Sequence, residues 1–137
     1  MNIKEKLLKI QSELKAPKSQ YNNFGKYAYR SCEDILTAFK PLGVEHNATL
    51  FITDGIELIG DRYYVKATAT LADTESDEVI GVSAYAREEE NKKGQDSSQT
   101  TGSTSSYARK YALNGLFAID DTKDSNATNT HGVEPKT

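Results

Sequence analysis

The sequence has very little cysteine, histidine and tryptophan, and each scarcity excludes a class of protein. One cysteine, Cys32, occurs among 137 residues, so the chain can form neither an internal disulfide nor a cysteine-based zinc cluster. The two histidines, His46 and His131, are far apart in the sequence and form no metal or nucleophile motif with Cys32. Tryptophan is absent and hydrophobic residues make up 36% of the chain, which predicts a single economical core.

Long hydrophobic runs and nucleotide-binding motifs are also missing. No run of about 18 apolar residues occurs, so we expect no membrane contact. The N-terminal segment MNIKEKLLKIQSELK is too charged for a signal peptide. No GxxxxGK[ST] motif is present, which excludes the phosphate-binding loop of ATPases. These absences indicate a cytosolic protein, or one that a virus makes inside a cell, with neither a cofactor nor a metal ion.

The net charge of −3 argues mildly against a nucleic-acid partner, but the charge is unevenly distributed. Residues 44–90 hold eleven acidic and three basic side chains. The flanking segments 15–43 and 91–119 each have a net charge of +3. An acidic middle therefore separates two basic segments, and those two are the candidate contacts for a polyanion.

Two amphipathic helices are predicted in the first third of the chain. Apolar residues recur at helical spacing across residues 3–14, and this helix must end before Pro17. The segment SCED has the form of a capping box, with Ser31 as N-cap and Asp34 three positions later. A second helix is expected to begin there, and Pro41 and Gly43 are expected to end it.

The pattern then changes to the two-residue period of half-buried strands. Apolar and polar residues alternate over residues 49–53, 63–71 and 79–87. A break is expected near Asp54-Gly55 and a turn at Gly60-Asp61. Because short connections join antiparallel neighbours, we predict a meander of three or four strands.

A polar loop is expected over residues 88–102, followed by a third helix that begins near Gly102 or Ser103. From residue 120 the chain is too polar to pack and is predicted to be disordered. The sequence thus predicts one folded domain, residues 1–119, and a polar tail, residues 120–137. We expect the third helix to bury three of its residues in the core: Tyr111, Leu116 and Phe117.

Two segments, one around YNNFGKYAYRS and one from Lys92 to Lys110, combine cations with aromatic rings. Cations neutralise phosphates and release counterions, and rings stack on unpaired bases whatever their identity. Hydroxyl groups and the expected helix N-terminus near Gly102 can hold phosphate oxygens, and Gly25 allows a close approach of the backbone. We interpret the first segment as a loop that faces nucleic acid. The candidate DNA-binding residues are Lys18, Tyr21, Phe24, Lys26, Tyr27, Arg30, Arg87, Lys92, Lys93, Gly102, Ser103, Ser106, Arg109 and Lys110.

Several stretches resemble one known family. They are KYAYRSCEDILTAFKPLG, GDRYYVKATATLAD, VIGVSAYAREEENKKGQD and above all TGSTSSYARKYALNGLFAIDDTKD. The sequence is similar in these stretches to the Erf family, the essential recombination function proteins of bacteriophages and prophages. The resemblance runs from about Lys18 to Asp124, and its most specific part is Gln99 to Asp124.

The resemblance implies a protein that is not an enzyme: an ATP-independent single-strand annealing protein that coats single-stranded DNA, pairs complementary strands and assembles as a ring or helical filament. It implies an α+β annealing-ring fold, with a bent antiparallel sheet of three to four strands packed on helices. Relatives often carry a C-terminal extension thought to contact the host single-strand binding protein. That protein or a phage exonuclease is therefore a further expected partner, in the cytoplasm of a bacterial host.

Three other functions stay open at this point. A plain coating protein would bind single-stranded DNA without accelerating pairing. A metal-dependent nuclease could use acidic residues such as Glu88, Glu89 and Glu90, although a solvent-exposed charge run beside a loop explains them more simply. An interaction module would bind a partner other than nucleic acid. In a purely structural interpretation, the first segment is an ordered loop whose rings cover the sheet.

Overall fold

The computed structural model describes residues 1–87 and 97–120, with side chains from Thr104 onward in the second range. A three-stranded antiparallel sheet forms one layer of the fold. Its strands are β3 (Ala48–Ile59), β4 (Arg62–Asp73) and β5 (Val79–Arg87), in the order β3-β4-β5. The described residues therefore form the predicted meander with three strands.

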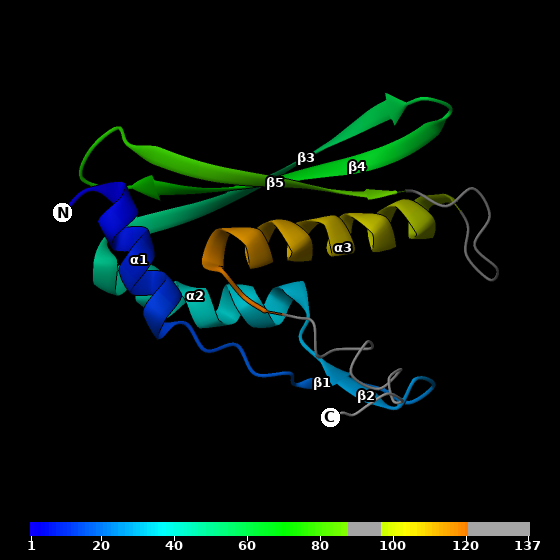
Figure 1. The fold of residues 1–137 in the computed structure, drawn as a ribbon, viewed down its shortest axis with the longest axis horizontal. Helices are drawn as coiled ribbons and strands as arrows, with labels where there is room; N and C mark the ends of the chain where they lie inside the picture. The colour runs from blue at the N-terminus through cyan, green and yellow to red at the C-terminus, as the bar shows by residue number, and fades with distance from the viewer. Residues whose placement is uncertain (88–96, 121–137) are drawn as a thin grey trace.

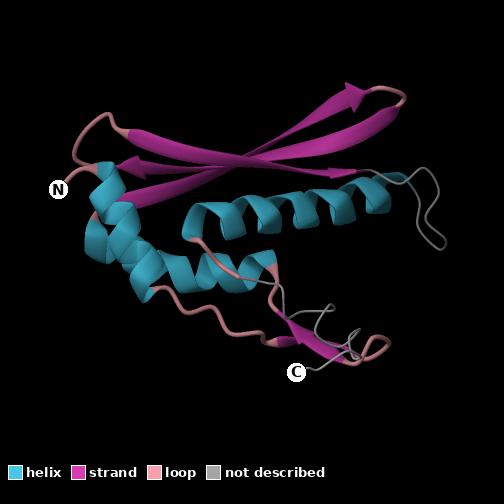
Figure 2. Cartoon of the chain, in the orientation of Figure 1, coloured by secondary structure: helices cyan, strands magenta, loops and turns pink. Residues whose placement is uncertain are grey.

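The helices form the second layer. Figures 1 and 2 show α1 (Ile3–Glu13), α2 (Cys32–His46) and α3 (Ser97–Phe117) on one side of the sheet, with α3 running along it. A separate hairpin of β1 (Gln20–Asn22) and β2 (Tyr27–Tyr29) connects α1 to α2 and lies away from the sheet. The expected α+β class is confirmed.

Strand alternation decides which residues face the helices. Val65, Ala67, Ala69 and Leu71 of β4 are buried, while the side chains between them are only half-buried. The β3–β4 hairpin turns at Gly60, whose φ of 65° is left-handed and suits glycine, as the sequence predicts. The sheet consequently has one face against the helices and one face without a helix among the described residues.

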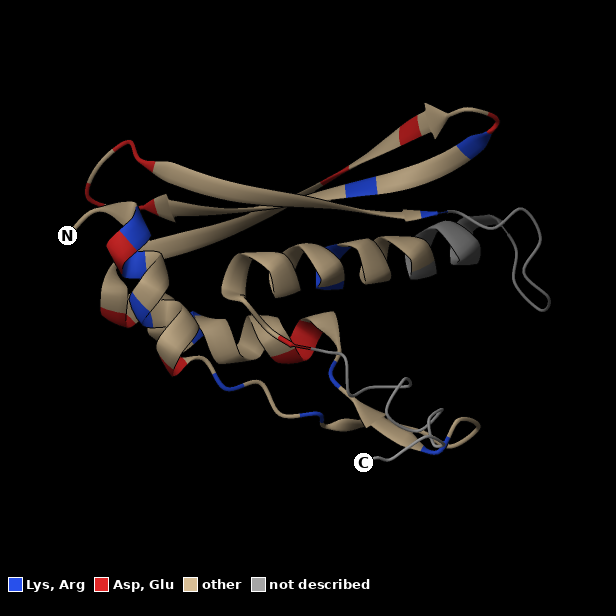
Figure 3. Cartoon of the chain, viewed as in Figure 1, with Lys and Arg blue, Asp and Glu red and all other residues tan. Residues whose placement is uncertain are grey.

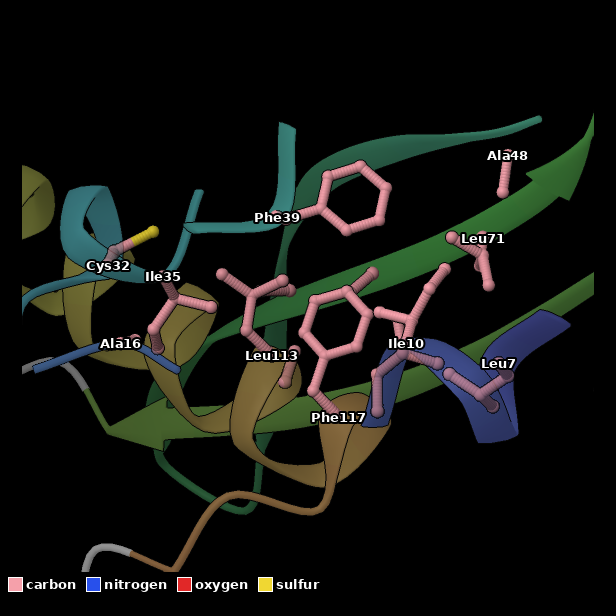
Figure 4. Packing of buried hydrophobic residues seen from close by; sticks show 14 of the residues in the cluster. Leu7, Ile10, Ala16, Cys32, Ile35, Phe39, Ala48, Leu71, Leu113 and Phe117 are labelled. Atoms are coloured by element: carbon pink, nitrogen blue, oxygen red, sulfur yellow. The ribbon is translucent and has the colours of Figure 1, made fainter. Parts of the chain in front are cut away.

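The core lies between the sheet and the three helices (Figure 4). Ile10 of α1, Ile35 and Phe39 of α2, and Leu113 and Phe117 of α3 converge there. The rings of Phe39 and Phe117 stack with centroids 5.4 Å apart and planes at 22°. Each such buried side chain contributes about 1.5–3 kcal/mol by leaving water, so these contacts hold α2 and α3 together.

A buried lysine ties α1 to the end of the sheet. The Lys6 ammonium donates hydrogen bonds of 2.7 Å to Asp73 and 2.7 Å to Glu75, and one of 3.2 Å to the carbonyl of Asn47. Both Lys6 and Asp73 are buried. The hydrogen bond to Asp73 raises the pKa of Lys6, and the same bond lowers the pKa of Asp73 to about 2. Both groups therefore stay charged at neutral pH.

The expected end of the second helix at Pro41 and Gly43 is wrong, because α2 continues to His46. Pro41 lies on an exposed turn, where water can satisfy the carbonyl that loses its amide partner. Gly43 is buried and lets α2 pass close to the sheet: a Cβ there would lie 2.7 Å from the carbonyl oxygen of Ala48. The helix ends one turn later at Asn47, which takes the left-handed conformation with φ of 56°.

The expected break at Asp54-Gly55 is also wrong, since β3 pairs with β4 without interruption through these residues. Turn propensity is overridden by tertiary contacts, because the Asp54 carboxylate accepts hydrogen bonds from Ser105 and Arg109 of α3. The third helix begins at Ser97, earlier than predicted, and residues 97–102 are helical rather than part of a loop. The helix as a whole packs on β4 and β5, and such tertiary packing supplies most of the stability of a helix in a protein.

The expected burial of Tyr111 is wrong as well. The ring is 49% exposed, whereas Leu116 and Phe117 are in the core as predicted. The buried stripe of α3 runs instead through Ala108 and Ala112, whose small side chains let the helix lie close to the sheet. Tyr111 is one position out of phase with this stripe, so it points to solvent.

Candidate nucleic-acid interface

The two basic and aromatic segments of the sequence meet at one open pocket of about 250 Å³, here named the junction pocket. One wall comes from the end of β2 and the start of α2, and the other comes from α3. The lining residues are Tyr29, Arg30, Ser31, Cys32, Glu33, Ser106, Tyr107 and Lys110. Tertiary structure thus joins residues that are more than seventy positions apart in the chain.

The start of α2 is fixed by the predicted capping box, which the structure confirms. The Ser31 hydroxyl accepts a hydrogen bond of 3.1 Å from the amide of Asp34, and the Asp34 carboxylate accepts one of 2.8 Å from the amide of Ser31. Partial burial would raise the pKa of Asp34, but the hydrogen bonds from Ser31 and Ser19 hold it below its usual value. This box sets the direction in which the chain leaves β2 and enters the pocket wall.

Two aromatic rings and one ammonium group line the pocket, and two further rings lie against them. The Lys110 ammonium is 5.7 Å from the centroid of the Tyr29 ring, within range of a cation–π interaction. Tyr29 also lies against Tyr27, with centroids 5.9 Å apart. On α3, the rings of Tyr107 and Tyr111 stack with centroids 6.3 Å apart. The pocket therefore offers flat apolar surfaces beside positive charge.

Arg30 has a structural role beside its place in the pocket. Its Nε donates a hydrogen bond of 2.8 Å to the carbonyl of Ala16, and the side chain is half-buried. This bond ties the linker after α1 to the start of α2. Next to it, burial raises the pKa of the Cys32 thiol, so this cysteine is a poor nucleophile.

Arg109 is held by an acidic partner. Its Nε lies 3.1 Å and 3.2 Å from the two carboxylate oxygens of Asp54, and the Ser105 hydroxyl donates to the same carboxylate. Arg109 follows the pocket-lining Ser106 by less than one helical turn. It therefore belongs to the pocket surroundings, with its charge balanced by β3.

The segment expected to be a nucleic-acid loop is a β-hairpin, with Tyr21 paired to Ala28. Its left-handed residue is Lys26, with φ of 57°, and not Gly25. Glycine suits this position because a Cβ there would clash with the Tyr27 ring. The hairpin nonetheless leaves exposed side chains at its tip, and Figure 3 shows basic positions near that tip and before α2. The exposed candidate residues on the hairpin are Tyr21, Phe24 and Lys26.

The remaining predicted residues are scattered. Lys18 is half-buried in the linker before β1, and Arg87 is exposed at the end of β5 on the sheet face away from α3. Gly102 and Ser103 lie inside α3, which begins at Ser97, so the expected helix start at these residues is wrong, while their contact with DNA stays a prediction. Lys92 and Lys93 lie outside the described residues. Three of the candidate residues line the junction pocket, namely Arg30, Ser106 and Lys110, and Arg109 lies near them on α3.

Among the described residues, one group of side chains has the spacing of metal ligands: Glu13, Glu45 and His46, at the ends of α1 and α2. His46 Nε2 lies 3.0 Å from Glu13 and 3.8 Å from Glu45. These contacts already account for the cluster as a polar contact between the ends of the two helices. Glu88 to Glu90, considered for a nuclease, lie outside the described residues.

Five residues that line the pocket were not among the candidate contacts: Tyr29, Ser31, Cys32, Glu33 and Tyr107. Tyr29 and Ser31 were in the first segment, and Tyr107 was in the second, but none was chosen as a contact. A clear signal existed for Tyr29, because it alternates with Tyr27 in the motif YAY and must share its face. The role of Asp54 in holding Arg109 had no signal in the sequence.

The fold and the pocket together define a small α+β protein with rings and cations gathered where a hairpin meets two helices. This combination suits sequence-independent contact with unpaired nucleic acid. The chain belongs to the ERF superfamily, whose model matches residues 3–137. The resemblance found in the sequence is thereby confirmed.

A curated relative gives the same assignment. The chain is 65% identical over 119 residues to the Essential recombination function protein of Salmonella phage P22. The match covers 87% of this chain and 56% of the phage protein, so the chain spans little more than half of that relative's length. No solved structure matches the chain. Within the described residues, no helix is both long and apolar enough to span a membrane.

Proposed function

We propose that this protein binds single-stranded DNA without reading its sequence and anneals complementary strands without ATP during phage or prophage homologous recombination. Membership of the ERF superfamily and 65% identity to a phage recombination function protein support the biological setting. The observation that carries the chemistry is the junction pocket, where Lys110 lies over the Tyr29 ring and Tyr107 lines the opposite wall.

Each part of the pocket has a chemical task in this proposal. Lys110 neutralises a phosphate and releases its counterion, which supplies affinity that is independent of sequence. Tyr29 and Tyr107 offer ring faces on which any base can stack. Because neither interaction uses the base edges, a bound strand keeps its hydrogen-bonding groups for a complementary strand. This arrangement favours the pairing of complementary strands over the cleavage of a strand, so the proposed activity is not enzymatic.

Assembly into an oligomer is part of the proposal. In the described part of the chain, β3 and β5 each pair with β4 on one side only. Long strands with an unpaired edge are normally covered or paired, and neighbouring copies offer the simplest partner. An oligomer also places many copies of the pocket, each with a modest positive charge, along one strand of DNA. A host single-strand binding protein or a phage exonuclease remains a predicted further partner.

The direct test is an annealing assay with two complementary labelled oligonucleotides and no ATP, performed with and without a divalent metal. We expect faster pairing than in buffer alone, uncut strands in both conditions, and a complex larger than one chain by mass measurement. Binding without faster pairing would identify a coating protein instead. Metal-dependent shortening of the labelled strands would identify a nuclease, and a need for ATP hydrolysis would refute the proposal.

Lys110→Ala tests the pocket itself. We expect weaker binding to every sequence and a log–log salt slope smaller by about 0.7, the value for one lost phosphate contact on single strands. The matched control is Lys40→Ala, which removes an exposed lysine from α2 outside the pocket lining. Titrations of labelled oligonucleotides at several salt concentrations measure both slopes. Equal slopes for the two variants would show that the pocket does not hold DNA.

A further inference from the structure

The sheet face that points away from the helices carries its own cluster of rings and cations. Alternation along β4 places Arg62, Tyr64 and Lys66 on this face, and alternation along β5 adds Tyr85 and Arg87. Figure 1 shows all three helices on the opposite side of the sheet. Arg87 was among the candidate DNA contacts, but the sheet separates it from the junction pocket. We name this cluster the open sheet face.

The rings on this face are ordered by their neighbours. Tyr64 and Tyr85 meet edge to face, with centroids 6.4 Å apart and planes at 88°. The Lys66 ammonium lies 5.8 Å from the centroid of the Tyr85 ring. Glu57 of β3 accepts a hydrogen bond of 3.4 Å from the Tyr85 hydroxyl and lies 3.7 Å from the Lys66 ammonium. The face is therefore built on strands, which hold side chains in fixed register.

The charge of the face suits a polyanion. Strand pairing sets Lys66 opposite Tyr85 and Arg87 opposite Tyr64, so each cation lies next to a ring. Within the described strands, three cations, those of Arg62, Lys66 and Arg87, share this face with one carboxylate, that of Glu57, while Asp61 lies in the turn next to Arg62. The loose Lys66–Glu57 pair is open to water, since the two side chains are 38% and 42% exposed. A phosphate group can compete for Lys66 at such a site.

We propose that the open sheet face is a second binding surface for single-stranded DNA, weaker than the junction pocket and located on the other side of the sheet. This inference rests on the proposed function. Tyr85, which is 44% exposed, supplies the stacking surface. Lys66 and Arg87 contact phosphates, and the Thr68 and Ser83 hydroxyls, already 2.8 Å from each other, extend the polar track.

A second surface gives annealing a physical advantage. A protein that holds one strand in its pocket and captures another on its sheet raises the effective concentration of the second strand near the first. Weak capture is sufficient, because the captured strand must leave the surface in order to pair. A coating protein has no use for such a site.

The test uses a charge-matched pair of variants. Lys66→Gln combined with Arg87→Gln removes two cations from the open sheet face, and Lys4→Gln combined with Lys40→Gln removes two exposed lysines from α1 and α2. Each protein is first saturated with an unlabelled oligo-dT strand, and capture of a labelled second strand is then measured at 50 mM salt. Melting temperatures confirm that both variants fold.

We expect the open-face variant to bind the first strand like the control, within about twofold, and to capture the second strand far more weakly. On single strands, one phosphate contact contributes about 0.7 to the log–log salt slope, which raises the binding constant roughly eightfold when the salt concentration falls from 1 M to 50 mM. Two lost contacts should therefore weaken capture about sixtyfold at 50 mM salt. Tyr85→Ala should also weaken capture, without flattening its salt dependence. The annealing rate should fall in parallel with capture.

Three outcomes would overturn the inference. The parent protein could capture no second strand, the open-face variant could capture it as well as the control, or the open-face variant could lose first-strand binding while its melting temperature is unchanged. In the last case the two surfaces would be one site. If the parent protein bound no single-stranded DNA at all, the proposed function itself would fail, which is a separate result.

Discussion

Replacing Phe117 by alanine tests the contact that holds α3 against α2. The Phe117 side chain is 1% exposed, and its ring stacks on Phe39 at 5.4 Å. Removal of a buried phenylalanine side chain costs about 3–5 kcal/mol, because apolar area is lost and a cavity remains. The free energy of unfolding of a domain is about 5–15 kcal/mol in total, so Phe117→Ala should remove a large part of the stability. Phe117→Leu keeps most of the apolar volume and loses mainly the ring pair, worth about 0.5–1.5 kcal/mol.

Tyr111→Ala on the same helix is the matched control. Its ring is 49% exposed and stacks only at the surface, on Tyr107, so we expect a loss of at most about 1 kcal/mol. Urea titrations followed by circular dichroism, at one fixed protein concentration, measure all three variants. If Tyr111→Ala costs as much as Phe117→Ala, the helix is rotated relative to this structure and the reasoning is wrong.

Two further predictions concern stability. Because the pKa of Asp73 falls from 3.8 to about 2 on folding, its carboxylate stabilises the fold above pH 4, and this contribution is lost as the pH falls towards 2. Lys6→Met should lower the stability at pH 7, and its melting temperature should fall less than that of the parent between pH 5 and pH 2. If the melting temperature falls by as much as in the parent, other groups cause the loss of stability in acid. Gly43→Ala should lower the melting temperature, since the new methyl group would lie 2.7 Å from the Ala48 carbonyl oxygen and 2.8 Å from the Phe39 ring. A melting temperature equal to that of the parent would show that α2 can move away from the sheet.

Local signals in the sequence were sufficient for most of the elements. The period of the apolar residues predicted α1 and the alternating faces of β4 and β5, and the capping box at Ser31 predicted the start of α2. The errors fall where a tertiary contact outweighs a local preference. Pro41 is tolerated on an exposed turn of α2, and Asp54-Gly55 remains in β3 because Asp54 is held by α3.

The sequence predicted which types of residue form the candidate site, but it did not predict how these residues are arranged in space. The two segments rich in cations and rings could be identified from residue types alone, and so could the resemblance to the Erf family. Their meeting at one pocket could not, because it depends on the angle at which the hairpin and α2 pack against α3. The same limitation applies to Arg87, which shares a charge type with Lys110 but lies across the sheet from it.

The sequence by itself determined the class of fold, the family, and the kinds of side chain available for the proposed contact with DNA. Each of these depends on residue identity and short-range spacing, which the chain carries before it folds. Tertiary structure alone decided which cations are balanced by carboxylates, as Arg109 is by Asp54, and which surfaces the rings share. The physical reason is that electrostatic and stacking interactions act over a few ångströms, and such distances between remote residues exist only once the sheet and helices have packed.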